Sequence, residues 1–158
     1  MTLEWNVNNR ELIKNLALNT GTTSTPTFTN LCSTTEVTLT TDFEQQDWYV
    51  FCDSIQRSLI TGVAMSIETT VKIDLNNKAI TQLLGNLKAI LTDGNIAQYN
   101  NQLITFELLT GVTSNELTYT KFKVPAVLNF SDLGGAAEDA GEFSLTIVIN
   151  GKGEVVTD

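Results

Sequence analysis

Length, composition and charge narrow the function classes before any motif is considered. The chain has 158 residues, 42% apolar and 17% charged, which is enough for one domain with a hydrophobic core. Its 9 basic and 18 acidic residues give a net charge of -9, so it lacks the basic clusters that grip nucleic-acid phosphates. The absence of histidine excludes Ser-His-Asp and Cys-His catalysis and removes the commonest ligand of zinc.

Residues 1–35 are expected to form an N-terminal arm ahead of the main domain. The pattern from Asn9 to Leu18 favours a short helix. We expect a soluble protein that starts at Met1, because no apolar run is long enough for a signal peptide core or a membrane span. Thr20 to Asn30 is rich in Thr, Ser, Gly and Pro, and it has little apolar area to offset the entropy of ordering it. Taken alone, this segment is expected to be mobile.

Strand patterns begin at Glu36 and lead into a long alternating run. Residues 36–43 and 47–53 each read as a strand, and a longer run starts near Ile55. Val63, Met65, Ile67, Val71 and Ile73 share the odd positions, and Ser66, Glu68, Thr70, Lys72 and Asp74 share the even positions. This alternation predicts a strand with one dry face and one polar face.

Residues 76–91 have the period of a helix. Its apolar stripe consists of Ile80, Leu83, Leu84, Leu87, Ile90 and Leu91. Asn76 is the expected N-cap, and Gly94 is the expected left-handed residue after the C-terminus. We expect this stripe to lie against a sheet.

Strand signals resume after the helix and define the fold class. They cover residues 102–110, 116–124, 126–132 and 142–149, with a hairpin loop at 111–115 and an interruption at Pro125. Asn150-Gly151 predicts a type I′ turn leading to a final strand. The sequence therefore predicts a mainly β (α+β) domain over residues 36–158, an antiparallel β-sandwich or half-barrel with one flanking helix, within a single domain overall.

The groups that could carry chemistry are better explained structurally. Cys32 and Cys52 are interpreted as free thiols that behave as small buried apolar residues, with one disulfide as the alternative. An aromatic platform could be built from Trp48, Tyr49 and Phe51, but adjacent strand residues point to opposite faces, which favours core packing. The acidic stretch from 132 to 142 lacks EF-hand spacing. No catalytic, cofactor or metal site is expected.

One stretch resembles a known family. Trp48, followed by DSIQRSLITG (53–62) and a long alternating strand, resembles the major tail proteins that build the tube of long-tailed bacteriophages. In that family a segment of the type W…D-x-x-x-R-S-L-x-T-G leads into a central strand. The late runs FSDLGG (130–135) and EFSLT (142–146) are similar as well, so the resemblance covers roughly Glu36 to Val156.

The resemblance implies a structural virion protein rather than an enzyme. Family members form hexameric rings whose inner sheets join into a β-barrel, and the stacked rings make a hollow tube that delivers DNA without binding it specifically. The implied partners are further copies of itself, tail tip and terminator proteins, and the tape-measure protein, without a membrane. The implied location is the virion tail, after synthesis in the host cytoplasm.

The resemblance also suggests which residues line the channel and join the rings. A polar strand face suits a water-filled channel, so the lumen-facing candidates are Ser66, Glu68 and Thr70, with Glu107 and Glu116 assigned by neighbouring alternation. The candidates for contacts between rings are Thr20, Thr22, Thr23, Thr27 and Phe28.

Two other interpretations stay open at this point. The acidic, Thr- and Asn-rich composition also suits a secreted β-sandwich that binds carbohydrate or acts as an adhesin. That reading predicts a monomer, an export signal on the precursor and an exposed aromatic platform. A hydrolase with paired carboxylates would need two acidic residues that converge in a cleft.

Overall fold

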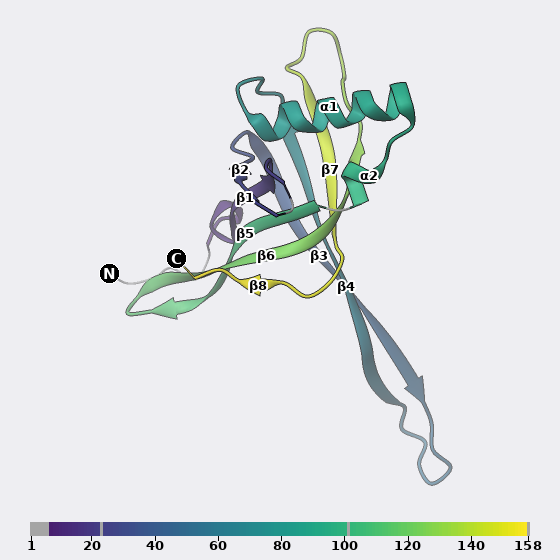
Figure 1. Cartoon of the computed structure of the whole chain (residues 1–158). Helices are drawn as coiled ribbons and strands as arrows, with labels where there is room; N and C mark the ends of the chain where they lie inside the picture. The colour runs from purple at the N-terminus through teal and green to yellow at the C-terminus, as the bar shows by residue number, and fades with distance from the viewer. Residues whose placement is uncertain (1–6, 23, 101, 158) are drawn as a thin grey trace.

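A computed structural model describes residues 7–22, 24–100 and 102–157 of the chain. They form a single antiparallel sheet with the strand order β2-β1-β5-β6-β7-β4-β3, while β8 pairs with β6. The strands are β1 (Ile13–Asn19), β2 (Phe28–Asn30), β3 (Thr34–Trp48), β4 (Arg57–Lys72), β5 (Gln102–Thr113), β6 (Glu116–Ser131), β7 (Glu142–Ile149) and β8 (Glu154–Val155). The helices are η1 (Asn9–Glu11), α1 (Lys78–Asp93) and α2 (Ala97–Asn100). The predicted mainly β fold with one flanking helix is confirmed (Figure 1).

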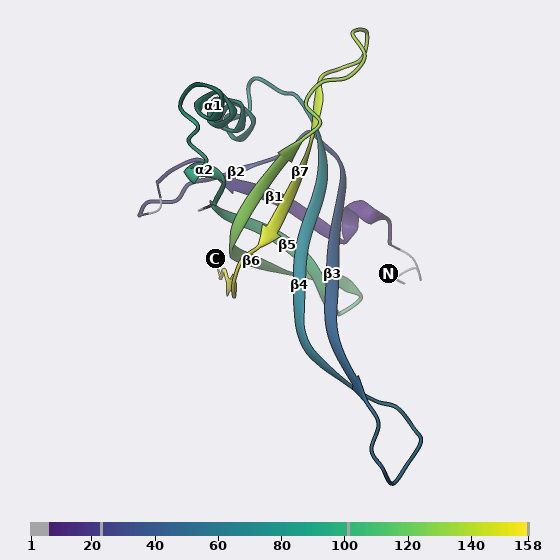
Figure 2. The same cartoon turned by 90° about the vertical axis from the view of Figure 1, so that its right-hand side faces the viewer.

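The sheet folds over on itself because β6 serves two neighbours. The first part of β6 pairs with β5, and its last part, from Ala126 to Ser131, pairs with β7. As a result β1 and β5 cross the direction of β7, β4 and β3 (Figures 1 and 2). The space between these two parts of the sheet holds the core, whose fully buried large side chains include Ile67, Ile80, Ile104, Phe143 and Ile147.

The helix expected over Asn9 to Leu18 is wrong beyond its first turn. Only Asn9–Glu11 is helical, as a 3-10 turn, and Ile13–Asn19 is a strand. Leu16, Ala17 and Leu18 are consecutive and all buried, so both sides of β1 are covered, which a one-sided surface helix could not provide. Residues of β1 and β2 therefore belong to the same sheet as the rest of the chain.

Strands β3 and β4 form one long hairpin. β3 is a single strand, although the sequence predicts two shorter strands in this region. β3 runs without a break from Thr34 to Trp48, and residues 49–56 are the connecting loop. The Asp53 carboxylate accepts a hydrogen bond from the backbone N–H of Ile55 at 2.6 Å and pairs with Arg57 at 3.1 Å, which orders the loop. The outer half of this hairpin projects away from the body (Figures 1 and 2). We call residues 43–63 the hairpin arm.

Helix α1 begins two residues later than predicted and uses a different cap. Asn77, not Asn76, is the N-cap, and its side chain accepts a hydrogen bond from the N–H of Ala79 at 2.9 Å. The left-handed C-terminal residue is Gly94 with φ 66°, as predicted. Ile80 and Leu83 are buried in the core, but Leu91 is exposed, so mainly the N-terminal half of the apolar stripe packs on the body.

Two predictions about the late strands are wrong. Pro125 does not interrupt β6. Its carbonyl accepts a hydrogen bond from the N–H of Asn150, just past the end of β7. The proline nitrogen lies on the same side of β6, where β7 has ended and no backbone donor is required. Asn150-Gly151 does not turn β8 back onto β7. Instead β8 pairs with β6 on the same edge as β7, beyond the point where β7 ends, with Glu154 opposite Lys123.

Candidate functional site

The most regular polar surface lies across β3, β4, β7 and β6. The strand registers place Glu68 opposite Thr38 on one side and Thr146 on the other. Rows of this kind define what we call the polar face: Thr38, Glu68, Thr146 and Asn129; Glu36, Thr70, Ser144 and Ser131; and Thr40, Ser66, Val148 and Val127. These three rows contain two carboxylates and no Lys or Arg, so their fixed charge is negative; the next row along β4 holds the ion pair of Lys72 with Glu142.

The alternation that the sequence predicted along β4 holds at the centre of the strand. Ile67 and Val71 are fully buried, whereas Glu68 is exposed and Ser66 and Thr70 are half-buried. The structure thus brings these three predicted lumen residues together on the polar face, and none of them points into the core. Their facing a channel stays a prediction.

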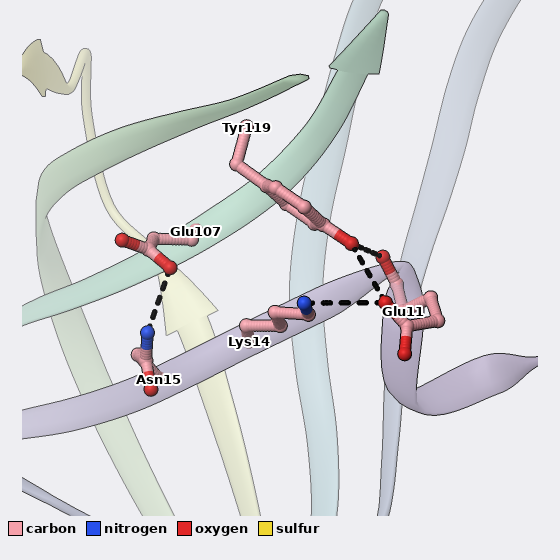
Figure 3. A network of polar contacts seen from close by, with 5 residues as sticks. All are labelled: Glu11, Lys14, Asn15, Glu107 and Tyr119. Atoms are coloured by element: carbon pink, nitrogen blue, oxygen red, sulfur yellow. Dashed lines mark hydrogen bonds and ion pairs between the residues drawn. The ribbon is translucent and has the colours of Figure 1, made fainter. Parts of the chain in front are cut away.

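Glu107 is held in a separate network on β1, β5 and β6 (Figure 3). It accepts a hydrogen bond from Asn15 Nδ2 at 2.7 Å. Beside it, Lys14 Nζ lies 3.2 Å from the Glu11 carboxylate and 4.4 Å from the centre of the Tyr119 ring. The Tyr119 hydroxyl donates to the Glu11 carbonyl at 2.7 Å. This network fastens η1 and β1 to the sheet.

The charges in this network stabilise one another. Hydrogen bonds from Lys14 and from Tyr119 lower the pKa of Glu11 below its ordinary value. Hydrogen bonds with Tyr119 and Glu11 raise the pKa of Lys14. Both groups therefore remain ionised at neutral pH, and the network is a structural clamp rather than a proton donor or acceptor.

The other two acidic candidates occupy different places. Glu107 lies opposite Lys121, which is on the same parity of β6 as Asn129, so it belongs to the far end of the same sheet face as Glu68. Glu116 is the first residue of β6 and has the parity of Phe122, which points toward the core. Strand alternation therefore places Glu116 on the opposite side of the sheet from Glu68.

The predicted contact residues between rings lie around the β1–β2 loop. Thr20 follows β1, Thr22 and Thr27 are exposed in the loop, and Phe28 begins β2. Asn19 closes this loop, because its side-chain oxygen accepts from the N–H groups of Gly21 and Thr27 at 2.9 and 3.0 Å. Thr23 lies outside the described residues. The loop is presented at the surface, and its role stays a prediction.

The aromatic residues of the family-like motif do not pack in the core, contrary to prediction. Trp48, Tyr49 and Phe51 lie at the end of the hairpin arm, and their exposed fractions are 40%, 66% and 112%. Cys52 is exposed beside them, and Cys32 is exposed at the other end of β3, so the expectation that both thiols are buried is also wrong. Both cysteines are free. An apolar end on a projecting hairpin is typical of a contact surface.

A β-bulge sets the two faces of the hairpin arm. Phe43 pairs with Val63 on the core side, but Gln45 pairs with Ile60, so Thr61 is an extra residue in β4. Because of this extra residue, Leu59 lies on the same side of the hairpin as Trp48 and not on the core side. Each face of the arm therefore carries exposed apolar side chains.

Strand β3 forms an open edge of the sheet. In the described part of the chain it pairs with β4 alone, over its whole length from Thr34 to Trp48. Monomeric proteins commonly protect such edges with Lys, Pro or a short strand. β3 is 15 residues long and contains neither Lys nor Pro, so its backbone is available to another strand.

Across residues 7–22, 24–100 and 102–157, no group of three or more Cys, Asp or Glu side chains is placed to hold a metal ion. None of the helices described is long and apolar enough to cross a membrane.

Comparison with known proteins identifies the fold. No protein-family model matches the chain, and no curated protein matches it. A chain from the tail of an empty gene transfer agent (GTA) particle with C6 symmetry superposes with a TM-score of 0.60 at 12% identity, covering 96% of this chain and 100% of the other. A chain from the sheath–tube complex of an extracellular contractile injection system (PVC) gives 0.56 at 12% identity, covering 98% and 95%. A chain from the anti-feeding prophage baseplate gives 0.52 at 11% identity, covering 98% and 97%.

These matches define a class by architecture. The fold is one found in the tails and injection machines of phage-like particles, and it spans nearly the whole chain. The tail-tube resemblance of the sequence is thus confirmed at the level of fold. What sequence reasoning missed is the hairpin arm, although the absence of a turn signal between Phe43 and Asp47 could have indicated one continuous strand.

Proposed function

We propose that copies of this chain associate through their sheet edges into six-membered rings, which stack into a hollow tail tube through which DNA is delivered. The observation that carries this proposal is the 15-residue β3 edge, which borders a four-strand polar face. Pairing of that edge with a neighbouring copy would extend the polar face around a closed channel and leave no free edge.

The charge of the polar face supports DNA passage. Glu36 and Glu68 supply carboxylates that repel phosphates, and the neighbouring hydroxyls keep the surface wet. Because the three rows of the polar face have no cationic side chain, and Lys72 in the next row pairs with Glu142, DNA would slide past without being held. The C6 symmetry of the matching tail particle supports a ring of six.

Electron microscopy of the purified full-length chain over a range of concentrations tests the proposal. We expect hollow tubes or six-fold rings. Light scattering that shows only monomers at every concentration would contradict self-assembly, and a monomer that binds glycans would favour the adhesin interpretation.

Proline substitutions at two neighbouring β3 positions test the edge itself. Successive N–H groups of a strand point in opposite directions. One of the two substitutions, Thr40→Pro or Thr41→Pro, therefore breaks the pairing with β4, and the other blocks only the open edge. We expect one variant to melt near the wild-type temperature yet remain monomeric. A well-folded pair of variants that both form tubes would exclude β3 edge pairing.

We propose stacking of the rings through residues 20–30, which comprise the β1–β2 loop and strand β2. Thr22 is exposed there, so Thr22→Glu should leave the fold intact while single rings accumulate at the expense of tubes. Thr113→Glu is a suitable control, because it is an exposed threonine in a different hairpin. Normal tube lengths for Thr22→Glu would count against this placement.

A further inference from the structure

We propose that residues 1–7, the N-terminal segment, add to the open edge of β3 as an extra strand of their own chain, and that a neighbouring copy displaces them when rings form. The docking is independent of the proposed tube, whereas the displacement rests on the edge pairing proposed above. Residues 1–6 lie outside the described part of the chain, and the surface beside which the chain enters that part has room for them.

That surface is a groove of about 660 Å³. Asn9 and Arg10 line it together with the start of β3, from Thr34 to Leu39. Four of its six apolar lining residues also pack against the hydrophobic core, so the groove is a place where the core opens to the surface between β1 and β3, which do not pair. The six are Leu12, Ile13, Val37, Leu39, Leu108 and Leu109.

The N-terminal segment has the period of a strand with one apolar side. Its apolar residues are Met1, Leu3, Trp5 and Val7, and its polar residues are Thr2, Glu4 and Asn6. The start of β3 alternates in the same way, with Val37 and Leu39 half-buried on the core side and Glu36 and Thr38 exposed on the polar face. In the register that turns Leu3 and Trp5 toward the groove, the polar side chains of the segment continue the polar face.

The backbone of β3 offers the hydrogen bonds that such a strand needs. In the described part of the chain β3 pairs with β4 alone, and it contains neither Lys nor Pro. The N-terminal segment also lacks Pro, so none of its peptide N–H groups is missing. Seven residues match the length of β3 from Thr34 to Thr40, which is about 20 Å at roughly 3.3 Å per residue.

Proximity selects the segment of the same chain as the occupant. Val7 is two residues from Asn9, which lines the groove. So short a connection gives the segment an effective concentration on the order of millimolar, which a second copy in dilute solution does not reach. Charge does not make this choice, because Arg10 and Glu36 both line the groove.

The docked segment would protect an edge that has no protection in its own sequence. Long open edges invite uncontrolled pairing between molecules. The segment and a neighbouring copy need the same backbone groups of β3, so each edge pairs with one or the other. A neighbour that pairs along the whole 15-residue strand forms more hydrogen bonds than seven residues can, and it therefore displaces the segment.

Trp5 is a direct probe of docking. The chain has two tryptophans, Trp5 and Trp48, so Trp48→Phe leaves Trp5 as the single indole. The full-length Trp48→Phe protein is studied over a dilution series, with light scattering to report assembly and acrylamide quenching to report the exposure of Trp5. In the folded monomer we expect blue-shifted emission and weaker quenching than in urea, and in tubes we expect quenching to increase.

Each other outcome of the dilution series overturns a defined part of the proposal. Strong quenching of Trp5 in the folded monomer would exclude docking. Shielding that appears only as copies associate would mean that another chain fills the groove. Shielding that persists in tubes would exclude displacement, and assembly that survives every dilution would contradict a protected edge. If no tube forms at any concentration, the proposed function fails, and the monomer still decides whether the segment docks.

Substitutions in the segment test the same contact with Trp48 in place. In the monomer, Leu3→Ser should speed hydrogen exchange of the outward-facing β3 amides about tenfold or more, because it removes a buried leucine. Glu4→Gln, on the polar parity, is the matched control and should not change the exchange. Circular dichroism confirms folding of both variants, and equal exchange in both would overturn the docking.

The direction of the effect on assembly separates a protecting strand from one that joins subunits. Leu3→Ser should begin to assemble at a lower protein concentration than the wild type, because its β3 edge is more often uncovered. A higher concentration for folded Leu3→Ser would show that the segment supports contacts between copies, and it would overturn the proposal.

Discussion

Glu68 on β4 and Thr146 on β7 lie directly opposite each other, in the middle row of a polar face whose three rows have carboxylates but no cation. Their side chains lie on the side of the sheet opposite the core residues Ile67 and Leu145. Because Glu68 is exposed, its charge can be inverted without burying a lysine.

Reversing that charge should make assembled tubes bind DNA. We expect Glu68→Lys tubes to retain a short labelled DNA, to release it as salt is raised, and to slow ejection in a particle, because a lysine ring would hold phosphates. Fluorescence anisotropy measures the binding. Glu116→Lys, which makes the same change on the other parity, is the control; equal DNA binding by both variants would contradict the assignment of the channel face.

The helix cap can be tested with two adjacent asparagines. Asn77→Ala should lower the free energy of unfolding by about 0.5–2 kcal/mol, because it removes the N-cap. The same side chain also donates a hydrogen bond to the carbonyl of Asn30 at 2.7 Å, so the loss of unfolding free energy should lie toward the upper end of that range. Asn76→Ala should have a much smaller effect. Urea denaturation separates the two, and an equal loss for both would mean that the cap is wrongly placed.

Neighbouring residues of β7 should respond very differently to truncation. Ile147 is fully buried, so Ile147→Val should cost about 0.5–1.5 kcal/mol through the small cavity it leaves. Val148 points to the polar face and is 41% exposed, so Val148→Ala should change stability by about 0.5 kcal/mol or less although it removes more atoms. Denaturant midpoints provide the comparison, and the reverse order would invert the faces of β7.

The Glu11 clamp should show itself at acidic pH. Because the pKa of Glu11 is lowered on folding, its contribution is complete above the ordinary value of 4.5 and is lost as the pH falls through the lowered pKa. The difference in melting temperature between wild type and Glu11→Gln should therefore be constant near neutral pH and shrink in acid.

Substitution of the two partners should identify the cause of that shift. Lys14→Met should raise the pKa of Glu11 more than Tyr119→Phe does, since the hydrogen bond from Lys14 is the larger contribution. NMR titration of the Glu11 carboxyl carbon measures both. A larger rise in Tyr119→Phe would reverse the assignment of the dominant partner.

The elements that could be predicted are those whose pattern reflects one local environment. The polar and apolar parities of β4 near Glu68 follow from a sheet with a dry side and a wet side. The period of α1 and the left-handed Gly94 are equally local. The predicted hairpin after β5 is present, but its loop is Ser114-Asn115 alone, both at positive φ as a tight turn requires, and not residues 111–115.

The wrong predictions concern environments that only the tertiary structure creates. Leu16 to Leu18 resemble part of a helix until both sides of β1 are covered. Trp48 and Phe51 are aromatic residues of the kind found in cores, and a single sequence does not distinguish an internal core from an exposed apolar surface. Pro125 is tolerated because β7 stops beside it, and the pattern of β6 alone does not contain that fact.

Thr61 is the single extra residue in the outer half of the β3–β4 hairpin, and it determines which apolar side chains share a face of that hairpin. By shifting the pleat, it turns Ile60 toward Phe43 and Leu59 toward Trp48. The bulge thus groups Leu59 with Trp48 and Ile60 with Phe43, so each face of the arm exposes apolar side chains to water.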